Sequence, residues 1–525
     1  MKQWCLSSAF SLLFFILLPL TAVTQPGRNL SVTGSVFNDS NGDGIRDPGE
    51  TGIPGVAVSN GVDVVLTDSG GNWELPFKSY KDLFIIKPPI WKVPVNADMI
   101  PQHFYSDFSE NQTDDGQIQP VHFPLMPDVF QDRFSMLVFS DTQARGLKEV
   151  NFINHDVVSE CIGTDAAFGL SLGDIVADDP MLFLEVSQGI AQTGIPWYNT
   201  FGNHDNDRKA TTNEKRDSTF RRFFGPSTYA FEYGQVAFIV INNVFFGETG
   251  RYKAHITDDQ LAFMRNYLKH VSEEKLVVVA MHIPVVACDN REELFGILSS
   301  RPHLFSVSGH THDQRNLWLG EEHGWSGRHS HHHLVCPAVS GSWWCGMIDE
   351  RGIPHATMND GSPNGYSIIT FVGNSYNVRF KAAGRADDYQ MNIYLPDEME
   401  TSAADTTSVL VNVFAGSERS VVEMKAGRDG GWIPMTAVKT VDPACLQMHQ
   451  LTPFLQETVL GKRLDTIFGW AMDYPSVTNH IWEASLPAGL PPGTHQVTVR
   501  TTDMYGQTWT GHRIFRINDG QHGNR

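Results

Sequence analysis

Five apolar segments between residues 134 and 313 end in side chains that can bind metal ions. The segments read "FSMLVFSDTQ", "AAFGLSLGD", "GIPWYNTFGNHD", "EKLVVVAMHIP" and "PHLFSVSGHTHD", and their ends supply Asp141, Gln143, Asp174, Asn203, His204, His282, His310 and His312. One such ending would indicate only a turn, because Asp and Thr side chains often bond nearby backbone where a strand stops. Five endings of the same design indicate a shared site.

The donor atoms at these endings are carboxylate and amide oxygens and imidazole nitrogens, without thiolates. This set suits Mn²⁺, Zn²⁺, Fe²⁺ or Mg²⁺. Without His204, seven side chains remain as metal ligands. Seven exceed what one ion needs if it keeps a position open for water, whereas two ions sharing a bridging carboxylate fit the count. Asp141 and Gln143, like His310 and His312, stand two positions apart and so share one face of an extended chain. Glycines in "GD", "GNH" and "GH" allow sharp turns close to the ions.

The elements that must position these residues belong to a central α/β domain, which we expect over residues 129–384. Apolar strands alternate there with helix-like stretches, and sites of open α/β sheets form at the carboxyl ends of strands. Thr257 and Gln260 form a capping box before a helix whose apolar face we expect in the core.

Short β-type runs broken by Gly, Asn, Asp and Pro occupy residues 25–128 and 385–525, which predicts one β-sandwich on each side of the central domain. The C-terminal segment shows no chemistry of its own. Binding of a substrate or surface and covering of the catalytic core are both open roles for it.

The stretch "DSNGDGIRDPGE" (39–50) fits the calcium-loop pattern D-x-[DN]-x-[DN]-G-x5-E throughout. Hard oxygen donors in this number suit Ca²⁺, and Gly44 permits the turn. The expected ligands are Asp39, Asn41, Asp43, Asp47, Glu50 and the carbonyl of Ile45. The flanks are strand-like, so the loop would lie in a β-domain, and it resembles the calcium-binding repeats of bacterial surface proteins. The alternative is an Asx-rich turn without an ion.

Length, composition and charge narrow the class of protein. A chain of 525 residues with 41% apolar and 19% charged residues predicts several folded domains. Its formal net charge of −20 repels phosphate backbones and argues against a nucleic-acid duplex as a partner. A small phosphorylated substrate that reaches a locally cationic metal site remains compatible.

The first 24 residues have the pattern of a secretory signal peptide. Lys2 precedes the apolar run 9–20, and "TAVTQ" follows. That run is shorter than the roughly 20 residues of a membrane-spanning helix. We therefore expect an exported protein, periplasmic or extracellular, without a transmembrane segment after cleavage; the alternative is an uncleaved anchor. Cys336 and Cys345 are close enough in sequence for a disulfide, which spacing alone does not establish.

Taken in order, D-x-[H/Q], GD-x(n)-D, GNH[DE], a lone His and GHTH over 141–312 resemble the motifs of the calcineurin-like metallophosphoesterases. The resemblance implies an α/β fold, a metallophosphoesterase β-sandwich flanked by helices, with an all-β domain on each side. It implies that one metal is held by Asp141, Gln143, Asp174 and His312, and the second by Asp174, Asn203, His282 and His310. His204 would then face the leaving oxygen.

Two positions depart from the family pattern. Gln143 stands where many members have His, and its harder, weaker oxygen favours Mn²⁺ or Mg²⁺ over tight Zn²⁺; members with Gln resemble Mn²⁺-dependent diphosphatases. Ala177 stands where a carboxylate usually orients the catalytic His. Asp178, one residue further on, is the candidate to replace it.

The resemblance and the donor set together predict an exported dinuclear phosphoesterase. Hydroxide bridging the metals would attack the phosphate ester, and His204 would assist the leaving group. Monoesters, diesters and pyrophosphates all remain open as substrates. The alternative is a calcium-stabilised surface-binding protein with an inactive phosphoesterase scaffold.

Further residues are candidates for substrate contacts, each with a structural alternative. His331 and His333 of "RHSHHH" either reach the substrate or belong to a strand. Trp343 and Trp344 of "GSWW" stack on a base or sugar unless they are buried. Arg145 pairs with a substrate phosphate or is a solvated loop residue.

Overall fold

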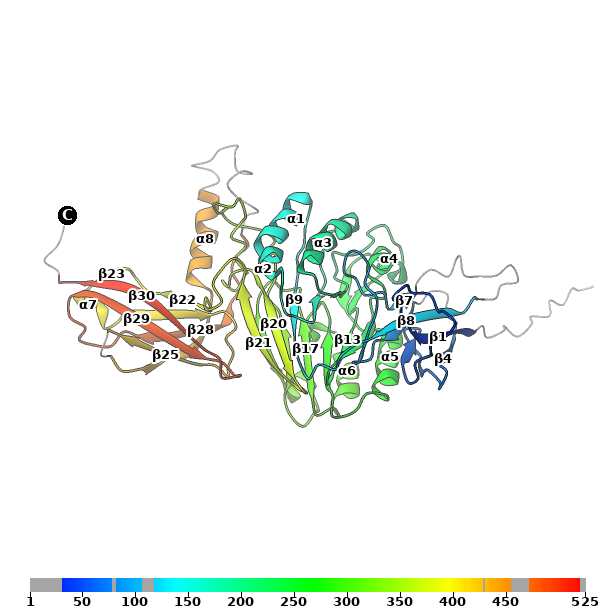
Figure 1. Ribbon diagram of the computed structural model, residues 1–525. Helices are drawn as coiled ribbons and strands as arrows, with labels where there is room; N and C mark the ends of the chain where they lie inside the picture. Colours follow the sequence, from blue (N-terminus) through cyan, green and yellow to red (C-terminus); the bar gives the residue numbers. More distant parts are fainter. Residues whose placement is uncertain (1–30, 78–81, 106–117, 428–429, 455–471, 520–525) are drawn as a thin grey trace, which may run out of the picture.

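The structure is a computed structural model, which describes residues 31–77, 82–105, 118–427, 430–454 and 472–519. Three β-sandwiches follow one another along the chain and give an elongated molecule (Figure 1). The predicted signal peptide lies outside the described residues. Among those residues, no helix combines the length and hydropathy that crossing a membrane requires.

The central sandwich consists of two facing sheets, as the α/β prediction required, and the predicted fold class is confirmed. In spatial order, one sheet contains β11 (Trp197–Asn199), β10 (Phe168–Ser171), β9 (Arg133–Phe139), β20 (Gly365–Val372) and β21 (Ser375–Ala382). The other contains β12 (Tyr229–Tyr233), β13 (Val236–Val240), β16 (Leu276–Ala280), β17 (Leu304–Ser308), β19 (His331–Val335) and β18 (Arg315–Leu319). Strands such as β16 are apolar throughout because helices cover the outer faces of these sheets.

The helices of the central domain lie along two opposite sides of the view in Figure 1. On one side are α1 (Leu147–Ile153), α2 (Ser159–Cys161), α3 (Phe183–Ile190) and α4 (Ser218–Phe224), and on the other are α5 (Asp258–Leu268) and α6 (Arg291–Leu298). The capping box predicted at Thr257 and Gln260 is confirmed at the start of α5, whose Leu261, Met264 and Leu268 are buried. β14 (Val244–Phe246) and β15 (Tyr252–Ala254) pair as a small antiparallel hairpin, which forms a two-stranded sheet of its own.

The N-terminal sandwich has its own core and is also fused to the central domain. Its sheets contain β4 (Asn72–Pro76), β1 (Ser31–Asn38), β8 (Val121–Pro127) and β6 (Trp91–Lys92), and β3 (Val64–Leu66), β2 (Ala57–Ser59), β5 (Leu83–Ile86) and β7 (Phe104–Tyr105). Phe84 and Ile86 pack into the central core. Lys87, directly after β5, forms a parallel bridge with Phe231 of β12.

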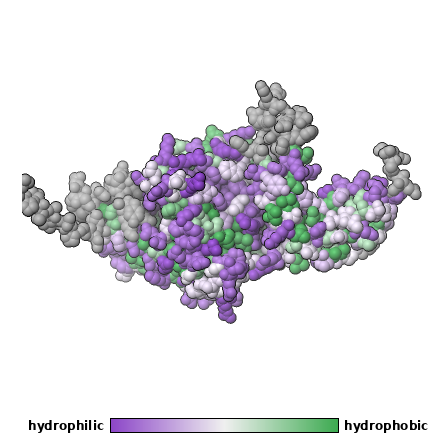
Figure 2. Space-filling view, turned by 180° about the vertical axis from the view of Figure 1, so that it is seen from behind, coloured by the Kyte–Doolittle hydropathy of each residue, from purple (hydrophilic) through white to green (hydrophobic). Residues whose placement is uncertain are grey.

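The C-terminal sandwich packs around a separate hydrophobic core. Its sheets contain β22 (Met391–Tyr394), β24 (Ser408–Val413), β28 (Thr478–Ser485) and β27 (Thr436–Thr440), and β23 (Glu398–Glu400), β30 (Thr508–Asn518), β29 (Gly493–Thr502), β25 (Val421–Ala426) and β26 (Ile433–Pro434). Two helices, α7 (Thr401–Ala404) and α8 (Pro443–Phe454), complete it. On the described face in Figure 2, hydrophilic residues predominate and hydrophobic ones form smaller patches.

A buried polar network joins this C-terminal sandwich to the central domain. Asp360 accepts a hydrogen bond from the backbone N–H of Gln314 at 2.7 Å, and its Oδ2 lies 3.2 Å from Nε2 of His480. Nδ1 of the same imidazole lies 2.8 Å from Oδ1 of Asn412. Asn359, next to Asp360, donates its backbone N–H to the carbonyl of His312 at 3.1 Å. The C-terminal domain therefore supports the GHTH loop.

The cysteines do not cross-link the described chain. Cys161, Cys288, Cys336, Cys345 and Cys445 are all buried free thiols. The Cys336–Cys345 disulfide that the spacing allowed is therefore absent from the described residues.

Candidate metal centre

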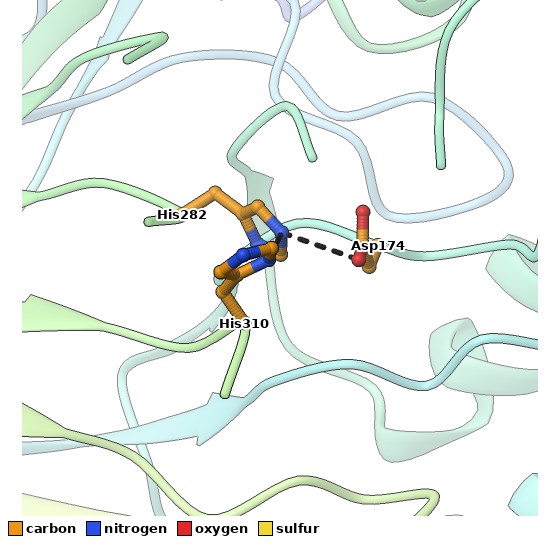
Figure 3. Close-up of side chains that lie close together, drawn as sticks. All are labelled: Asp174, His282 and His310. Carbon is orange, nitrogen blue, oxygen red and sulfur yellow. Dashed lines mark hydrogen bonds and ion pairs between the residues drawn. The ribbon is translucent and has the colours of Figure 1, made fainter. Parts of the chain in front are cut away.

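Parallel pairing brings the five polar strand endings to one edge of the central sandwich. β9, β10 and β11 are parallel neighbours in the first sheet, and β16 and β17 are parallel neighbours in the second. Their carboxyl ends therefore point the same way. Asp174, which follows β10, meets His282 and His310, which follow β16 and β17 (Figure 3).

The side chains from both sheets touch across this edge. His282 is central: its Nε2 lies 3.2 Å from Asp174 Oδ2, 3.1 Å from Asn203 Oδ1 and 3.1 Å from His310 Nδ1. Gln143 donates from Nε2 to Asp174 Oδ2 at 3.1 Å. One ligand atom each from Asp174, His282 and His310 all lie within 4.8 Å of one another. All five strand endings thus share one cluster of donors.

Asp141 and His312 extend the cluster on the side of Gln143. Nε2 of His312 lies 3.7 Å from Oδ1 of Asp141, and Oδ2 of Asp141 accepts the backbone N–H of His310 at 2.9 Å. Oδ1 of Asp141 and Oε1 of Gln143 are buried and accept no hydrogen bond from any described residue. A buried polar atom without a partner costs about 1–3 kcal/mol. These two oxygens lie close to imidazoles and to the carboxylate of Asp174, and such a set of donors is suited to divalent cations.

The backbone at the cluster is held in the left-handed region. The φ angles are +49° at Asp141, +39° at Gln143, +50° at Asp174, +76° at His310 and +53° at His312. This region is uncommon for residues other than glycine, and each such residue costs on the order of 1–3 kcal/mol. Strain concentrated at one group of polar side chains is typical of a functional site, where other contacts hold the strained residues in place.

Glycines let the loops approach as the sequence suggested. A Cβ added to Gly202 would lie 2.0 Å from the backbone nitrogen of Asp174 and 2.3 Å from its Oδ1. A Cβ on Gly309 would lie 1.8 Å from Oγ of Ser140 and 2.6 Å from Oδ2 of Asp141. No larger residue fits at either position without moving a ligand.

Burial and neighbouring charges set the protonation of the cluster. Burial alone would raise the pKa of Asp174, but His282 and His204 hold that pKa well below its usual range. Burial opposes a charge on His282, yet Asp174 raises the pKa of His282 to about 9. Burial and His282 lower the pKa of His310 to about 4. His310 is therefore neutral at pH 7, as a metal ligand must be, whereas a cation would displace the proton of His282.

His204 and Asp178 form a pair at the open side of the cluster. Nδ1 of His204 lies 3.0 Å from Oδ1 of Asp178, and the backbone N–H of His204 donates to Asp174 at 2.8 Å. Asp178 has a φ of +70°, and its other oxygen lies 3.0 Å from Nη2 of Arg208. The carboxylate one position beyond Ala177 thus contacts the imidazole that it was expected to orient.

Asp205, which the sequence analysis did not single out, fastens two of the loops together. It is fully buried and accepts the backbone N–H of Val176 at 3.1 Å and that of Gly202 at 2.9 Å. Burial, with Asp174 nearby, raises the pKa of Asp205 to about 8. The available signal was its position directly after "GNH".

Of the five candidates for substrate contacts, one lies at the donor cluster, and the other four are buried or bonded to other residues of the protein. The half-buried indole of Trp343 lies 4.9 Å from the His204 ring and 5.8 Å from the His312 ring, between centroids. Trp344 is fully buried and donates to the carbonyl of Thr142 at 3.1 Å. The guanidinium of Arg145 pairs with Glu149 at 3.0 Å and also contacts the carbonyl of Trp343.

His331 and His333 lie inside the second sheet, not in an open loop. Both are buried on β19, and both contact Oγ of Ser306, at 2.7 Å from His331 and 2.6 Å from His333. These two histidines and Trp344 are therefore buried and packed against other parts of the protein.

The candidate calcium loop forms a compact turn at the surface of the N-terminal sandwich. Asp39 accepts the backbone N–H groups of Gly42 at 2.8 Å and of Gly44 at 3.0 Å. The amide nitrogen of Asn41 lies 3.0 Å from Oδ2 of Asp43 and 2.9 Å from Oδ2 of Asp47. Gly44 has a φ of +76°, as the sharp turn requires. The loop thus gathers acidic side chains around the amide of Asn41.

Comparisons with known proteins match both flanking domains. The N-terminal domain of calcineurin-like phosphoesterases matches residues 40–121, and their C-terminal domain matches residues 333–509. No curated protein matches the chain.

The solved structures that match the chain include the following two, both at low identity. A purple acid phosphatase from yellow lupin (Lupinus luteus) seeds is 10% identical over 63% of this chain and 69% of that one, with a TM-score of 0.35. The spore cortex lytic enzyme SleM of Clostridium perfringens is 10% identical over 74% of this chain and 99% of that one, with a TM-score of 0.18. Neither likeness is close enough to carry an argument.

The match to the family's N-terminal domain precedes the segment 141–312, which supplies the clustered donors, and the match to its C-terminal domain follows that segment. Most of the central sandwich, with the clustered donors, lies between them. Over these two segments the chain matches the family models of the calcineurin-like phosphoesterases.

Proposed function

We propose that the chain hydrolyses phosphate esters with two divalent metal ions held at the edge of the central sandwich. The observation that carries the proposal is the convergence of seven donor side chains, two of which present buried oxygens without a hydrogen-bond partner. One ion would be held by Asp141, Gln143, Asp174 and His312, and the other by Asp174, Asn203, His282 and His310.

Bound ions would supply positive charge to the phosphoryl oxygens and acidity to water. The residues of the chain supply the rest. Asp178 fixes the ring of His204 through Nδ1, so that Nε2 is free to face a substrate. When protonated, that nitrogen gives its proton to the departing oxygen. Asp205 keeps the two loops that carry Asp174 and His204 at a fixed separation.

Gln143 bears on which metal is used. Its amide oxygen is a harder and weaker donor than imidazole, so Mn²⁺ is the expected ion, with Mg²⁺, Fe²⁺ and Zn²⁺ as the others to compare. Purified protein, analysed for metals after export, should hold close to two transition ions per chain. A chain without transition metal would instead support the inactive scaffold of a surface-binding protein.

Replacement of Asp174 by Asn tests the catalytic proposal. The variant should lose at least a hundredfold in hydrolysis of p-nitrophenyl phosphate with Mn²⁺ present, because both metals depend on that carboxylate. Asp165→Asn, the same change at an exposed position, serves as the control. Equal activity in the two variants would end the dinuclear proposal.

We further propose that the loop 39–50 binds Ca²⁺ and that the mature protein is exported. Asp39, Asn41, Asp43, Asp47, Glu50 and the Ile45 carbonyl are the proposed ligands. Millimolar Ca²⁺, supplied to protein stripped of metal, should raise the melting temperature, and Asp43→Ala should reduce that rise. If Ca²⁺ raises the melting temperature of Asp43→Ala as much as that of the wild type, Ca²⁺ does not bind at this loop.

A further inference from the structure

A cavity of about 700 Å³ opens directly beside the proposed phosphoryl site. Asn203 and His204 form the wall nearest the metal donors, and Phe246 and Tyr252 of the β14–β15 hairpin form another. The Tyr252 ring meets the His310 ring edge-on, with 6.0 Å between centroids. A substrate held at the cluster would therefore extend its leaving group into this cavity.

The segment after "GNHD" lines this cavity with positive charge. Arg208, Lys209 and Arg216 all line it, together with the carboxylates of Asp178 and Glu248. Asp178 is already paired with His204 and Arg208, and Glu248 is exposed. Three cationic side chains at one cavity contrast with a formal net charge of −20 for the whole chain.

Arg216 is fixed in place but has no carboxylate partner. Its Nη1 donates to Oδ1 of Asn206 at 3.2 Å and to the carbonyl of Arg208 at 3.1 Å, and its guanidinium lies 5.0 Å from the centroid of Phe246. Among the described residues, neither Arg216 nor Lys209 forms an ion pair with an acidic side chain. A half-buried guanidinium without a counter-charge is suited to a phosphate, which it can bind through two parallel hydrogen bonds.

We propose that this cavity binds a leaving group that carries its own phosphate, so that the preferred substrates are organic diphosphates. The proposal rests on the function proposed above. Water oxygen would bond to the terminal phosphorus and release one proton to solvent, while the bond from that phosphorus to the bridging oxygen breaks. The electron pair stays on the bridging oxygen, which departs as part of an organic monophosphate and takes up a proton from His204. Arg216 and Lys209 would receive the charge of that monophosphate.

A matched pair of substrates tests this. Thymidine 5′-diphosphate releases an anionic leaving group and thymidine 5′-monophosphate a neutral one, and phosphate release is measured for both. The wild-type kcat/KM for the diphosphate should exceed that for the monophosphate at least tenfold. Arg216→Met and Lys209→Met should each reduce this ratio at least fivefold. Lys269→Met removes a charge from the exposed end of α5 and should leave the ratio unchanged.

Binding to metal-free protein gives a second measurement, independent of turnover. By calorimetry with a chelator present, thymidine 5′-diphosphate should bind Lys209→Met and Arg216→Met more weakly than wild type. Lys209 is exposed, so its variant tests the proposal even if Arg216→Met folds poorly. A wild-type ratio near one, or variants that lose both substrates equally, would overturn the assignment. If the wild type does not hydrolyse p-nitrophenyl phosphate at all, the proposed function is refuted. The binding comparison then tests by itself whether the cavity binds an organic diphosphate.

Discussion

Lys87 offers a sharp test of how the N-terminal sandwich is joined to the central domain. Its side chain is 2% exposed, its Nζ donates to the carbonyl of Glu232 at 2.8 Å, and it lies 3.7 Å from the centroid of the Tyr233 ring. Burial, only partly offset by Asp128 and Glu232, lowers the pKa of Lys87 from 10.5 to about 7. A charged lysine is therefore costly at this junction.

The magnitude follows from that pKa. One pKa unit corresponds to about 1.4 kcal/mol, so keeping Lys87 charged in the folded state costs roughly 5 kcal/mol at low pH. The unfolded chain binds the proton more tightly, so stability rises as the pH increases from about 7 toward 10.5. Lys87→Met removes the charge but also loses the hydrogen bonds to the carbonyls of Glu232 and, at 3.3 Å, of Pro88, each worth about 1 kcal/mol. The net gain should be about 3 kcal/mol at pH 6, a rise of roughly 5 °C in melting temperature.

The assay is thermal unfolding of wild type and Lys87→Met at several pH values. At pH 6 the variant should have the higher melting temperature. Between pH 8 and 10 the melting temperature of the wild type should rise relative to that of the variant until the difference is lost. Lys92→Met, at a largely exposed neighbouring lysine, controls for loss of charge. If the difference between Lys87→Met and wild type is the same at pH 6 and pH 10, the burial argument is wrong.

Three further variants test the metal centre. Gly202→Ala should abolish metal binding, measured by calorimetry with Mn²⁺, because its Cβ would collide with Asp174, whereas Gly146→Ala has open space and should bind normally. Trp343→Gly should keep or raise the melting temperature, since Trp343 has a φ of +64°, while kcat/KM falls at least tenfold; unchanged kinetics would remove Trp343 from the site. Asp205→Asn should lower the unfolding free energy by about 1–3 kcal/mol, because one backbone N–H loses its acceptor, and a variant as stable as wild type would contradict that role.

The strand endings were predictable because apolar runs that stop at a polar residue are a local pattern. Asp174 and His282 stand at the ends of such runs, and parallel pairing then brings them together. Which strands share a sheet was not predictable, since pairing joins residues far apart in sequence. The sequence pattern of "RHSHHH" allowed a strand or a loop, and the burial of His333 depends on serines contributed by the neighbouring strand.

Other features depend on surroundings that a sequence does not display. Apart from its position after "GNH", nothing local distinguishes Asp205 from a solvated aspartate, since its role depends on N–H groups from two separate loops. Likewise, Arg216 faces the cavity only because the segment after "GNHD" folds back beside the β14–β15 hairpin.

The contact between Asp360 and His480 has a practical consequence for anyone who wishes to work with a shorter protein. A chain that ends at residue 385 would leave the buried carboxylate of Asp360 without His480, which lies 120 residues further along the chain. Asn359 would also lose the hydrogen bond that its carbonyl accepts from Ser476. The loop that carries His312 would then lose the C-terminal contacts that hold its partner Asn359 in place. The central domain and the C-terminal sandwich should therefore be expressed together, so that the buried contacts between them are kept.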